Sequence, residues 1–469
     1  MPQPPGTYEA NIRYTALVTE PENLDTSPDA EDNIIVDLPE NLIPVTYTGT
    51  DTSPEWSKAC TTCGKNYWHN YDEAKWANAV TVTAATRDYY NKAPIGTTIP
   101  ESAVLSYYVY IPRYAYEVQR ATPRNYQLCA DGSYIIPNSS RSACPTGYEP
   151  ALFNIQFQKN TDQKLTPYGI IGDTTGTCEA YAGPYETCAG SNNKFYTHPA
   201  FTYGTTELNG FWVPKFEMTN LTTNSKPTLA SRAMTAADFA TVLTASKVNN
   251  GTIGLMKNTE FAAISYLATS TYGRGSENIH INNSGFITGR SATLPNDSST
   301  TFVASPDNIY YGKIGVHAST TNNVYGIYDL SGSRREIVAG NLKKTIPWAF
   351  ATAFADQGID LSDGSWDEVI NFYSTFNSIS DGLGNLTNYR SCDATLYECL
   401  GHAFWEGYAY NADAINMPNF SSGAVWITRG GNKDSLTGAG LFSLQGFDGY
   451  WAVSPTTADN ARLVRRVME

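Results

Sequence analysis

Apolar residues in the first half of the chain follow the two-residue period of β-strands. The strongest signal is "AVLSYYVYIPRYAYEVQ" at residues 103–119, which is rich in valine and tyrosine. Pro112 within it predicts an edge strand or a bulge, because proline has no backbone N–H to donate. Further strands are predicted at residues 41–49, around Val80 and Val82, and at residues 210–220, which read "GFWVPKFEMTN".

Helical periodicity is found in three later segments. Residues 235–248 place Phe239, Val242 and Leu243 on one face of a helix. Residues 257–273 ("KNTEFAAISYLATSTYG") have the same period, and Gly273 is a candidate helix C-cap. In "SWDEVINFYSTF", Ser365 and Glu368 have capping-box spacing and predict a third helix. Few helices among many short strands and polar loops predict an α+β fold.

Five tyrosines lie at strand spacing within the strongest strand signal: Tyr107, Tyr108, Tyr110, Tyr114 and Tyr116. One interpretation is an aromatic binding platform. The favoured interpretation is structural, with one face of the strand in the core and the other forming a polar-aromatic face of the sheet.

Composition narrows the function classes. Only 16% of the 469 residues are charged and 13% are aromatic, so the surface must be built from Thr, Ser, Asn, Gly and Tyr, as in many extracellular and adhesive proteins. Abundant aromatics argue against disorder. A net charge of −14 argues against nucleic acid as a partner, because binding phosphates requires clustered Lys and Arg.

The sequence has no apolar run of about 18 residues, so no membrane span is predicted. The start, "MPQPPGTYEANIRYTALVTE", lacks the basic and apolar regions of a signal peptide. The sequence therefore suggests either a cytosolic protein or a mature form from which a leader or anchor has been removed. Residues 1–40 are rich in Pro, Asp and Glu, with one strand-like piece at 11–19, and are predicted to be an arm or linker to an anchor.

The eight cysteines form four close sequential pairs: Cys60/Cys63, Cys129/Cys144, Cys178/Cys188 and Cys392/Cys399. Each pair lies in a stretch rich in turn residues, which favours local disulfides that staple loop insertions and an oxidising compartment. The alternative is reduced loop thiols. Cys60 and Cys63 with His69 could also be half of a zinc site, but no second ligand pair is evident.

Other chemical motifs are missing from the sequence. The five histidines show no metal-binding spacing, and no nucleophile elbow, P-loop or dinucleotide fingerprint is present. No cofactor or catalytic residue is therefore predicted. Acidic turns at Asp131, Asp363 and Asp381 could bind a structural calcium ion through oxygen ligands, although plain turns are the simpler interpretation.

Four segments together resemble the formylglycine-generating-enzyme/sulfatase-modifying family: "ELNGFWVPKFEMTN", "GLMKNTEFAAISYLATSTYG", "NNVYGIYDLSGSRREIVAG" and "WITRGG…ARLVRRV". The third segment matches at Asn323, Gly326, Tyr328, Asp329, Gly332 and Glu336. The resemblance implies a C-type lectin-type fold over residues 200–469, preceded by a strand-rich part with stapled insertions at 41–199. The upstream blocks, including "YYVYIPRYAYEV", are similar to bacterial surface proteins with a pilin-like or otherwise anchored N-terminus.

The departures from that family bear on activity. Its enzymes act through cysteines near the closing strands, whereas no cysteine follows Cys399, and Ser333–Ile337 replace the family's Asn-Val-Trp-Glu-Trp core. The catalytic thiols therefore have no counterpart, and the prediction is that the protein is not an enzyme. Pro418 lacks the preceding carboxylate of calcium-dependent sugar sites, so no such site is carried over.

Residues 426–464 also resemble the variable region of proteins diversified by retroelements. Frame positions of that family match Arg429, Gly430, Gly431, Gly440, Phe442 and Arg462, together with Gly438, Ala439, Leu441, Leu463 and Val464. Residues 432–436 and 443–460 occupy the free positions, while Ala461 replaces an expected Phe. The resemblance implies that frame residues hold the fold and that free residues contact a ligand.

These observations predict an extracellular or surface-displayed protein that binds a protein or glycan on another cell or surface without catalysis. One predicted binding patch is Asn432, Lys433, Asp434, Ser435 and Leu436, a second is Phe447, Asp448, Tyr450 and Trp451, and Trp405, Tyr408 and Tyr410 extend them. Irregular aromatics between patterned strands suit a binding loop on a rigid scaffold. The alternatives are a formylglycine-generating-type oxidase with rewired chemistry and a structural pilus or virion subunit.

Overall fold

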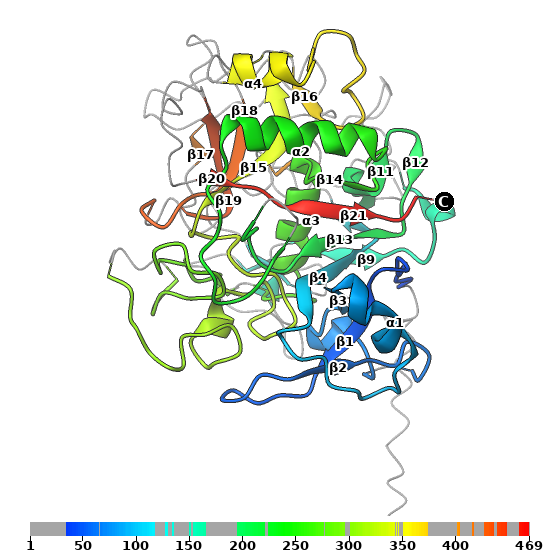
Figure 1. Ribbon diagram of the computed structural model, residues 1–469, viewed down its shortest axis with the longest axis vertical. Helices are drawn as coiled ribbons and strands as arrows, with labels where there is room; N and C mark the ends of the chain where they lie inside the picture. The colour runs from blue at the N-terminus through cyan, green and yellow to red at the C-terminus, as the bar shows by residue number, and fades with distance from the viewer. Residues whose placement is uncertain are drawn as a thin grey trace, which may run out of the picture.

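A computed structural model describes most of residues 34–117, 153–165, 195–295, 301–373, 401–403, 426–447 and 459–468. It leaves out Lys65 and residues 221–223, 276, 343, 345, 347–349 and 436–438, and it adds the backbone of four short strands elsewhere. The architecture is α+β, with several sheets and few helices (Figure 1). The strand-like piece at 11–19 lies outside the described residues.

The largest sheet is antiparallel and has seven strands in the order β14-β21-β13-β4-β3-β1-β2. Its members are β1 (Ile43–Tyr47), β2 (Trp56–Lys58), β3 (Asn78–Val82), β4 (Val104–Pro112), β13 (Gly210–Pro214), β14 (Ile253–Leu255) and β21 (Leu463–Arg466). Strand β13 pairs with β4 on one side and with β21 on the other. The sheet therefore joins strands from both sides of the predicted 199/200 boundary.

The predicted edge position of Pro112 is wrong. Strand β4 lies inside the sheet between β3 and β13, and Pro112 is its last residue. After Arg113 the chain continues as β5 (Tyr114–Glu117), which pairs with β9 (Ile155–Phe157) and β10 (Phe195–Thr197) in a separate three-stranded sheet. The segment predicted as one strand is thus divided between two sheets, and Arg113 lies between β4 and β5.

The predicted polar-aromatic face of this strand is also wrong. Tyr107, Tyr108, Tyr110, Tyr114 and Tyr116 are all buried, each at most 2% exposed. Both faces of β4 are covered, so apolar and aromatic residues run almost continuously instead of alternating with exposed ones. The same burial removes the alternative of a tyrosine binding platform on this strand.

A second sheet carries the C-terminal strands. Its order is β16-β15-β18-β19-β17, and β20 pairs with β15 off this path. The members are β15 (Arg335–Leu342), β16 (Asn371–Tyr373), β17 (Ile415–Asn416), β18 (Trp426–Gly430), β19 (Gly440–Phe447) and β20 (Asp459–Asn460). Figure 1 shows it to the upper left of the seven-stranded sheet, with the red β21 leading from it back to that sheet.

Helix α3 (Asn258–Ala268) contacts both β15 and β19, and all eleven of its residues are buried. It was expected to be amphipathic, but elements pack against every side of it. The helix ends at Thr269 as C-cap, so the predicted cap at Gly273 is wrong. One core cluster includes α3, β4, β13 and β19, and this shared core fixes the second sheet to the first.

Helix α2 (Ala236–Val248) was predicted correctly and begins with a capping box between Thr235 and Asp238. It packs on β14 and on α4 (Ala351–Asp356), and Phe239 stacks on Phe350 and meets Trp426 edge to face. The remaining helix, α1 (Ala84–Lys92), lies beside β3. Residues 71–73 form a 3-10 turn, η2 (Tyr71–Glu73).

The predicted helix at 365–376 is wrong. Residues 365–370 form turns, and the chain then enters β16, which runs parallel to β15. The Ser365 hydroxyl does not cap a helix but donates to Asp363 Oδ1 at 2.6 Å. Pairing with β15 and burial of Trp366, Val369 and Ile370 in the α2 core outweigh the local helical pattern.

The smaller elements lie around these sheets. They are the 3-10 turns η3 (Thr161–Gln163), η4 (Pro199–Phe201) and η5 (Gly315–Ala318), the hairpin β11 (Thr202–Tyr203) with β12 (Thr206–Glu207), and the strands β6 (Gln127–Cys129), β7 (Tyr134–Ile135) and β8 (Pro150–Ala151). Among the described residues, no helix has the length and apolar character needed to cross a membrane.

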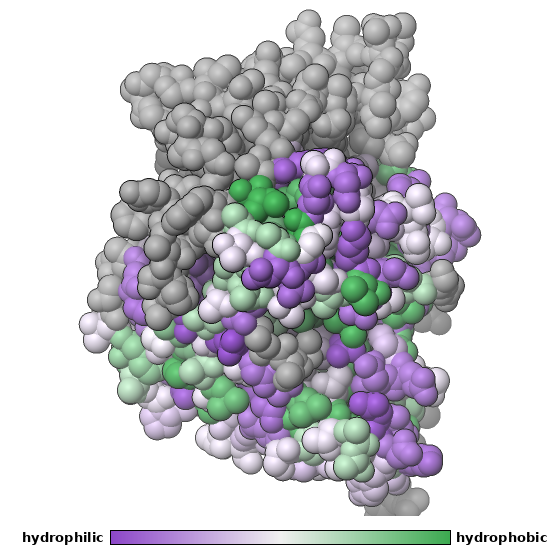
Figure 2. Space-filling view, turned by 45° about the horizontal axis from the view of Figure 1, so that its top comes forward, coloured by the Kyte–Doolittle hydropathy of each residue, from purple (hydrophilic) through white to green (hydrophobic). Residues whose placement is uncertain are grey.

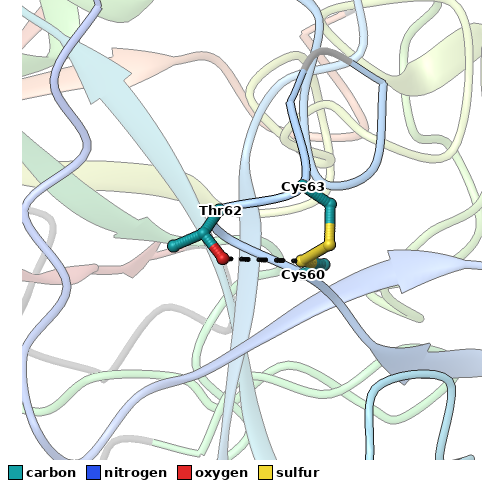
Figure 3. The surroundings of a disulfide bond; sticks show 3 residues. All are labelled: Cys60, Thr62 and Cys63. Carbon is teal, nitrogen blue, oxygen red and sulfur yellow. Dashed lines mark hydrogen bonds between the residues drawn. A yellow bond between two sulfur atoms is a disulfide. The ribbon is translucent and has the colours of Figure 1, made fainter.

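Cys60 and Cys63 form a disulfide at the end of the first β-hairpin (Figure 3). This confirms one predicted staple and shows that the pair is not half of a zinc site, since both sulfurs are bonded to each other. Cys129 lies in β6, where only the backbone is described. Cys144, Cys178, Cys188, Cys392 and Cys399 lie outside the described residues, so their pairing remains a prediction.

Candidate functional site

The candidate site is built on the hairpin of β18 and β19. The two strands pair from Trp426 opposite Phe447 to Gly430 opposite Gly440, with a register shift after Arg429. Strand β18 also pairs with β15, so the hairpin is held on its far side by a third strand. Residues 431–439 connect β18 to β19 at one end of this paired hairpin.

Arg429 fixes the base of this connection. Its guanidinium is fully buried and donates to Asn258 Oδ1 at 2.8 Å, to the His402 carbonyl at 2.6 Å and to the Ala403 carbonyl at 3.0 Å. The hairpin is thereby tied to the N-terminus of α3 and to residues 401–403. Burial lowers the pKa of Arg429 to about 10, so the guanidinium keeps its charge at neutral pH.

The histidine beside Arg429 has a structural role. His402 is buried, and its Nδ1 lies 2.6 Å from the Tyr373 hydroxyl. Burial, and then the charges of Lys257 and Arg429, lower the pKa of His402 to about 3. The imidazole is therefore neutral at neutral pH and is held by the Tyr373 hydroxyl of β16.

Gly430 and Gly431 turn the chain out of β18. Both have left-handed backbones, with φ of 79° and 63°. A Cβ on Gly430 would lie 2.7 Å from the Leu330 carbonyl oxygen, so a side chain would clash with the neighbouring segment. The other described frame positions are also buried: Gly440 begins β19, and Phe442 stacks with Tyr266 and Phe153 in the core.

Residues 432–435 form a turn held by its own side chains. Asn432 Oδ1 accepts from the Asp434 backbone at 2.9 Å and from the Ser435 hydroxyl at 3.0 Å. The Asn432 backbone donates in turn to the Ser435 hydroxyl at 3.0 Å. Asn432 and Ser435 therefore shape the loop, whereas the Lys433 and Asp434 side chains are 26% and 56% exposed.

The exposed pair lies beside a residue that the sequence did not single out. Lys433 Nζ is 2.6 Å from Asp434 Oδ1 and 5.4 Å from the centre of the Phe286 ring. Phe286 is half-buried, has φ of 75° and also stacks against the Arg334 guanidinium at 4.0 Å. Only Gly285 before it indicates a turn in the sequence, so nothing there marks Phe286 as a surface aromatic.

A pocket of about 370 Å³ adjoins Phe286 along the chain. It is lined by Ile287, Arg290, Phe302, Ala304, Ser305 and Pro306. Its walls are mainly apolar, and Arg290 provides one positive charge at the edge. This pocket begins one residue after Phe286, the aromatic residue that lies near Lys433.

The second predicted patch does not begin beside the first. Phe447 ends β19 opposite Trp426, seven residues from Gly440, or roughly 23 Å away at about 3.3 Å per residue. Only the backbone of Phe447 is described. Leu436, Asp448, Tyr450, Trp451, Trp405, Tyr408 and Tyr410 lie outside the described residues, so their role as binding residues remains a prediction.

Several positions assigned to the free set prove to be structural. Ser443 and Leu444 are buried in β19, and Asp459 and Asn460 are buried in β20. Asn460 bonds the Met218 backbone through both its N–H and its carbonyl, and Asp459 pairs with Arg335 at 2.8 Å. Free variation there would disrupt the sheet, so these four positions belong to the scaffold and not to the ligand surface.

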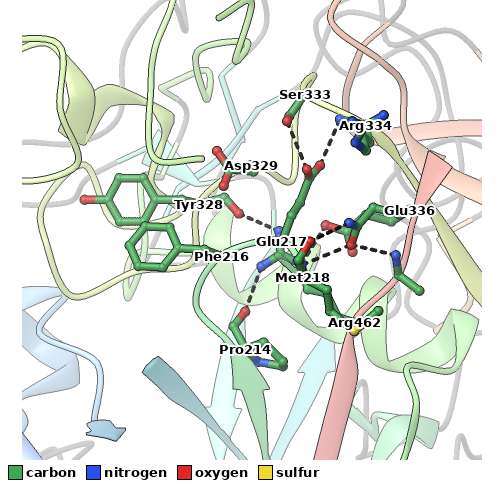
Figure 4. Close-up of polar contacts among 12 residues, drawn as sticks. Pro214, Phe216, Glu217, Met218, Tyr328, Asp329, Ser333, Arg334, Glu336 and Arg462 are labelled. Atoms are coloured by element: carbon green, nitrogen blue, oxygen red, sulfur yellow. Dashed lines mark hydrogen bonds and ion pairs between the residues drawn. The ribbon is translucent and has the colours of Figure 1, made fainter. Parts of the chain in front are cut away.

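Beneath the turn lies a buried polar network (Figure 4). The Lys433 backbone donates to the Ser333 carbonyl at 2.9 Å, and the Ser333 hydroxyl donates to Glu217 Oε2 at 3.0 Å. Glu217 Oε1 accepts from the Arg334 backbone at 2.9 Å. Arg462 donates to Glu336 and to the carbonyls of Pro214 and Tyr328. These bonds connect the residue before β21 to β13, to β15 and to the segment that contains Tyr328.

Charge is unbalanced in this network. Glu217, Asp329 and Glu336 are all buried near one another, and Arg462 is the guanidinium at their centre. Burial and the neighbouring carboxylates raise the pKa of Glu217 to about 8, and burial raises that of Asp329 to about 6. Glu217 is therefore protonated at neutral pH, so it serves as a neutral hydrogen-bonding group under the turn.

In the described part of the chain, no group of three or more His, Cys, Asp or Glu residues could hold a metal ion. Asp363 is exposed and bonds Ser365 within its own turn, while Asp131 and Asp381 lie outside the described residues. A structural calcium ion therefore remains a prediction. Hydrophilic and hydrophobic residues alternate over the described part of the face in Figure 2.

The chain was also compared with known proteins. Neither the protein-family models nor the curated proteins contain a match to it.

Proposed function

We propose that this chain is a non-catalytic, surface-displayed binding protein that recognises a protein or glycan through the turn at 432–435 and its neighbours. The observation that carries the proposal is a contrast over four residues. Arg429 is wholly buried and bonded to the scaffold, whereas Asp434 is exposed and Lys433 partly exposed on a turn that its own side chains stabilise. Rigid scaffolds that present exposed loop residues are the usual form of a recognition surface.

A C-type lectin-type fold is the scaffold we propose. In support, the closing strand β21 pairs with β13, the strand that opens the segment resembling the formylglycine-generating family. The segment "NNVYGIYDLSGSRREIVAG" is joined to them, because Arg462, directly before β21, donates to the Tyr328 carbonyl and pairs with Glu336. The four resembling segments thus form one connected unit around α3.

The chemistry of the surface suggests what it would bind. Lys433 and Asp434 offer one charge of each sign. Phe286 offers an aromatic ring that contacts the Arg334 guanidinium and lies near the Lys433 amine. The adjoining pocket adds apolar walls and Arg290. A ligand with an apolar or sugar-ring face next to polar groups suits this combination, since aromatic rings provide contact area at low entropic cost.

The proposal is tested by binding to immobilised arrays of glycans and of bacterial and host surface proteins. Wild-type protein is compared with a Lys433→Ala/Asp434→Ala variant and with a control, Lys344→Ala/Asp367→Ala, which removes an exposed ion pair elsewhere. We expect the control to keep every signal and the turn variant to lose at least tenfold in affinity. Equal binding by all three proteins would place recognition outside this turn.

Diversification is tested separately at the level of the gene. Related copies of the gene should differ most at codons 432–436 and 448–458, and a nearby near-identical repeat should differ from this region at adenines. Variation spread evenly over buried β18 and β19 would contradict the proposal, because those positions hold the scaffold.

A further inference from the structure

Lys215 lies directly after β13 and is completely buried. Its Nζ is 5.0 Å from the centre of the Trp56 ring and 5.8 Å from that of Tyr328. Within the described residues, no carboxylate forms an ion pair with this amine. Lysine is rarely buried without such a partner, because removing an ammonium from water is costly. Its single described hydrogen-bond partner is therefore of particular interest.

That partner is the side-chain amide of Asn78, the first residue of β3. Lys215 Nζ lies 2.7 Å from Asn78 Oδ1, and Asn78 is 1% exposed. The amide is fixed from its other end, where Nδ2 donates to the carbonyls of Trp76 at 2.9 Å and Tyr325 at 2.8 Å. The amide is therefore hydrogen bonded at both ends and fixed in one orientation, with its carbonyl oxygen beside the lysine amine.

The environment favours the amine in its reactive form. Burial lowers the pKa of Lys215 well below the usual value of a lysine, which favours the neutral amine over the ammonium. A lysine desolvated among apolar groups is a recognised activated nucleophile. Holding two reacting groups in contact replaces an encounter in solution and is equivalent to effective concentrations of about 10⁵ M or more.

We propose that Lys215 and Asn78 are joined by an amide crosslink formed within the folded chain. The Lys215 Nζ lone pair attacks Asn78 Cγ, giving a tetrahedral adduct with the oxygen at Oδ1. A proton moves from Nζ to Nδ2, the Cγ–Nδ2 bond breaks, and ammonia leaves as the Cγ–Nζ amide forms. Nothing is oxidised or reduced, and no other reactant is needed.

The crosslink would connect distant parts of the chain. The two residues are 137 positions apart, and β4 lies between their strands in the order β13-β4-β3. The bond would span β4 and connect β3 to the residue that follows β13. It would thereby join the N-terminal strands to the start of the region that carries the proposed binding turn. It does not depend on the proposed function, because it concerns the scaffold alone.

The test is the intact mass of the wild-type full-length chain after reduction and denaturation. We expect a mass below the sequence mass by one ammonia, about 17 Da. An unchanged mass would overturn the proposal. This measurement needs no variant, so a folding defect cannot obscure it.

Peptide mapping separates the crosslink from a succinimide at Asn78, which also loses ammonia. The crosslink predicts one branched tryptic species containing both residues, with no cleavage after Lys215. A separate Asn78 peptide with the mass loss and normal cleavage at Lys215 would contradict it. Lys257 is an internal control, because it is buried but bonds a backbone carbonyl, and it should be cleaved normally. Asn78→Ala and Lys215→Met should each restore the full mass.

Discussion

The Nε atom of Arg462 lies 2.6 Å from Oε1 of Glu336, and both side chains are at most 1% exposed. The two residues are 126 positions apart; Glu336 lies in β15, and Arg462 directly precedes β21. Arg462 also donates to the carbonyls of Pro214 and Tyr328, so one guanidinium joins β13, β15 and the segment before β21. These three bonds make it a central connection beneath the candidate site.

Replacing Arg462 by Met should lower the free energy of unfolding by about 3–5 kcal/mol, because Glu336 and two carbonyls would lose their buried partner. Urea unfolding followed by circular dichroism measures the change. The control is Lys344→Ala, which breaks an ion pair whose side chains are 36% and 55% exposed, and it should cost less than about 1 kcal/mol. Equal losses in the two variants would contradict the assigned role of Arg462.

Stability should fall as pH rises from 6.5 to 8. Burial raises the pKa of Glu217 to about 8, whereas an unfolded glutamate titrates near 4.3, so in this range the folded protein holds a proton that the unfolded chain has released. The resulting loss is up to about 1.4 kcal/mol per pH unit. Glu217→Gln carries no titrating proton and should show a flatter profile.

The comparison uses urea unfolding at several pH values. Asp363→Asn is the matched control, because Asp363 is fully exposed and hydrogen bonds from Ser365 lower its pKa, away from this range. Its profile above pH 6.5 should follow the wild type. A Glu217→Gln profile as steep as the wild-type profile would show that another group carries the proton.

Thr235→Ala should destabilise the protein by about 1 kcal/mol, because the Thr235 hydroxyl accepts the Asp238 N–H at 3.1 Å at the start of α2. Thr241→Ala in the same helix is the control. Its hydroxyl bonds only the preceding turn at Ala237, and the residue is exposed, so we expect a change within about 0.5 kcal/mol. Thermal unfolding of both variants decides whether the cap contributes as proposed.

Local patterns predicted α2 and the major strands because their determinants lie close in sequence. Phe239, Val242 and Leu243 are enough to indicate the buried face of α2. The same reasoning failed at 365–376, where Ser365 and Glu368 imitate a capping box. Pairing of β16 with β15 decides that segment, and its partner lies about thirty residues earlier in the chain.

The candidate site was only partly predictable for the same reason. The double glycine and the polar residues after it indicated the turn, and the structure shows that Asp434 is exposed there and Lys433 partly exposed. Phe286 could not be predicted, because its contact with Lys433 depends on how distant loops meet. The burial of Ser443 and Asn460 likewise follows from sheet pairing, which no local pattern reveals.

Substitution at the base of the turn should lower the stability of the protein, whereas substitution of the side chains on the turn should leave it nearly unchanged. Gly430→Ala requires a side chain at φ of 79° and 2.7 Å from the Leu330 oxygen, so it should cost more than about 1–3 kcal/mol of strain alone. Gly358→Ala is the control for backbone strain, since its φ is 65° but no described atom lies within 4 Å of the new Cβ. The Lys433→Ala/Asp434→Ala variant should stay within about 0.5 kcal/mol of the wild type. Thermal unfolding that ranked the turn variant with Gly430→Ala would mean that Lys433 and Asp434 support the fold and are not free for recognition.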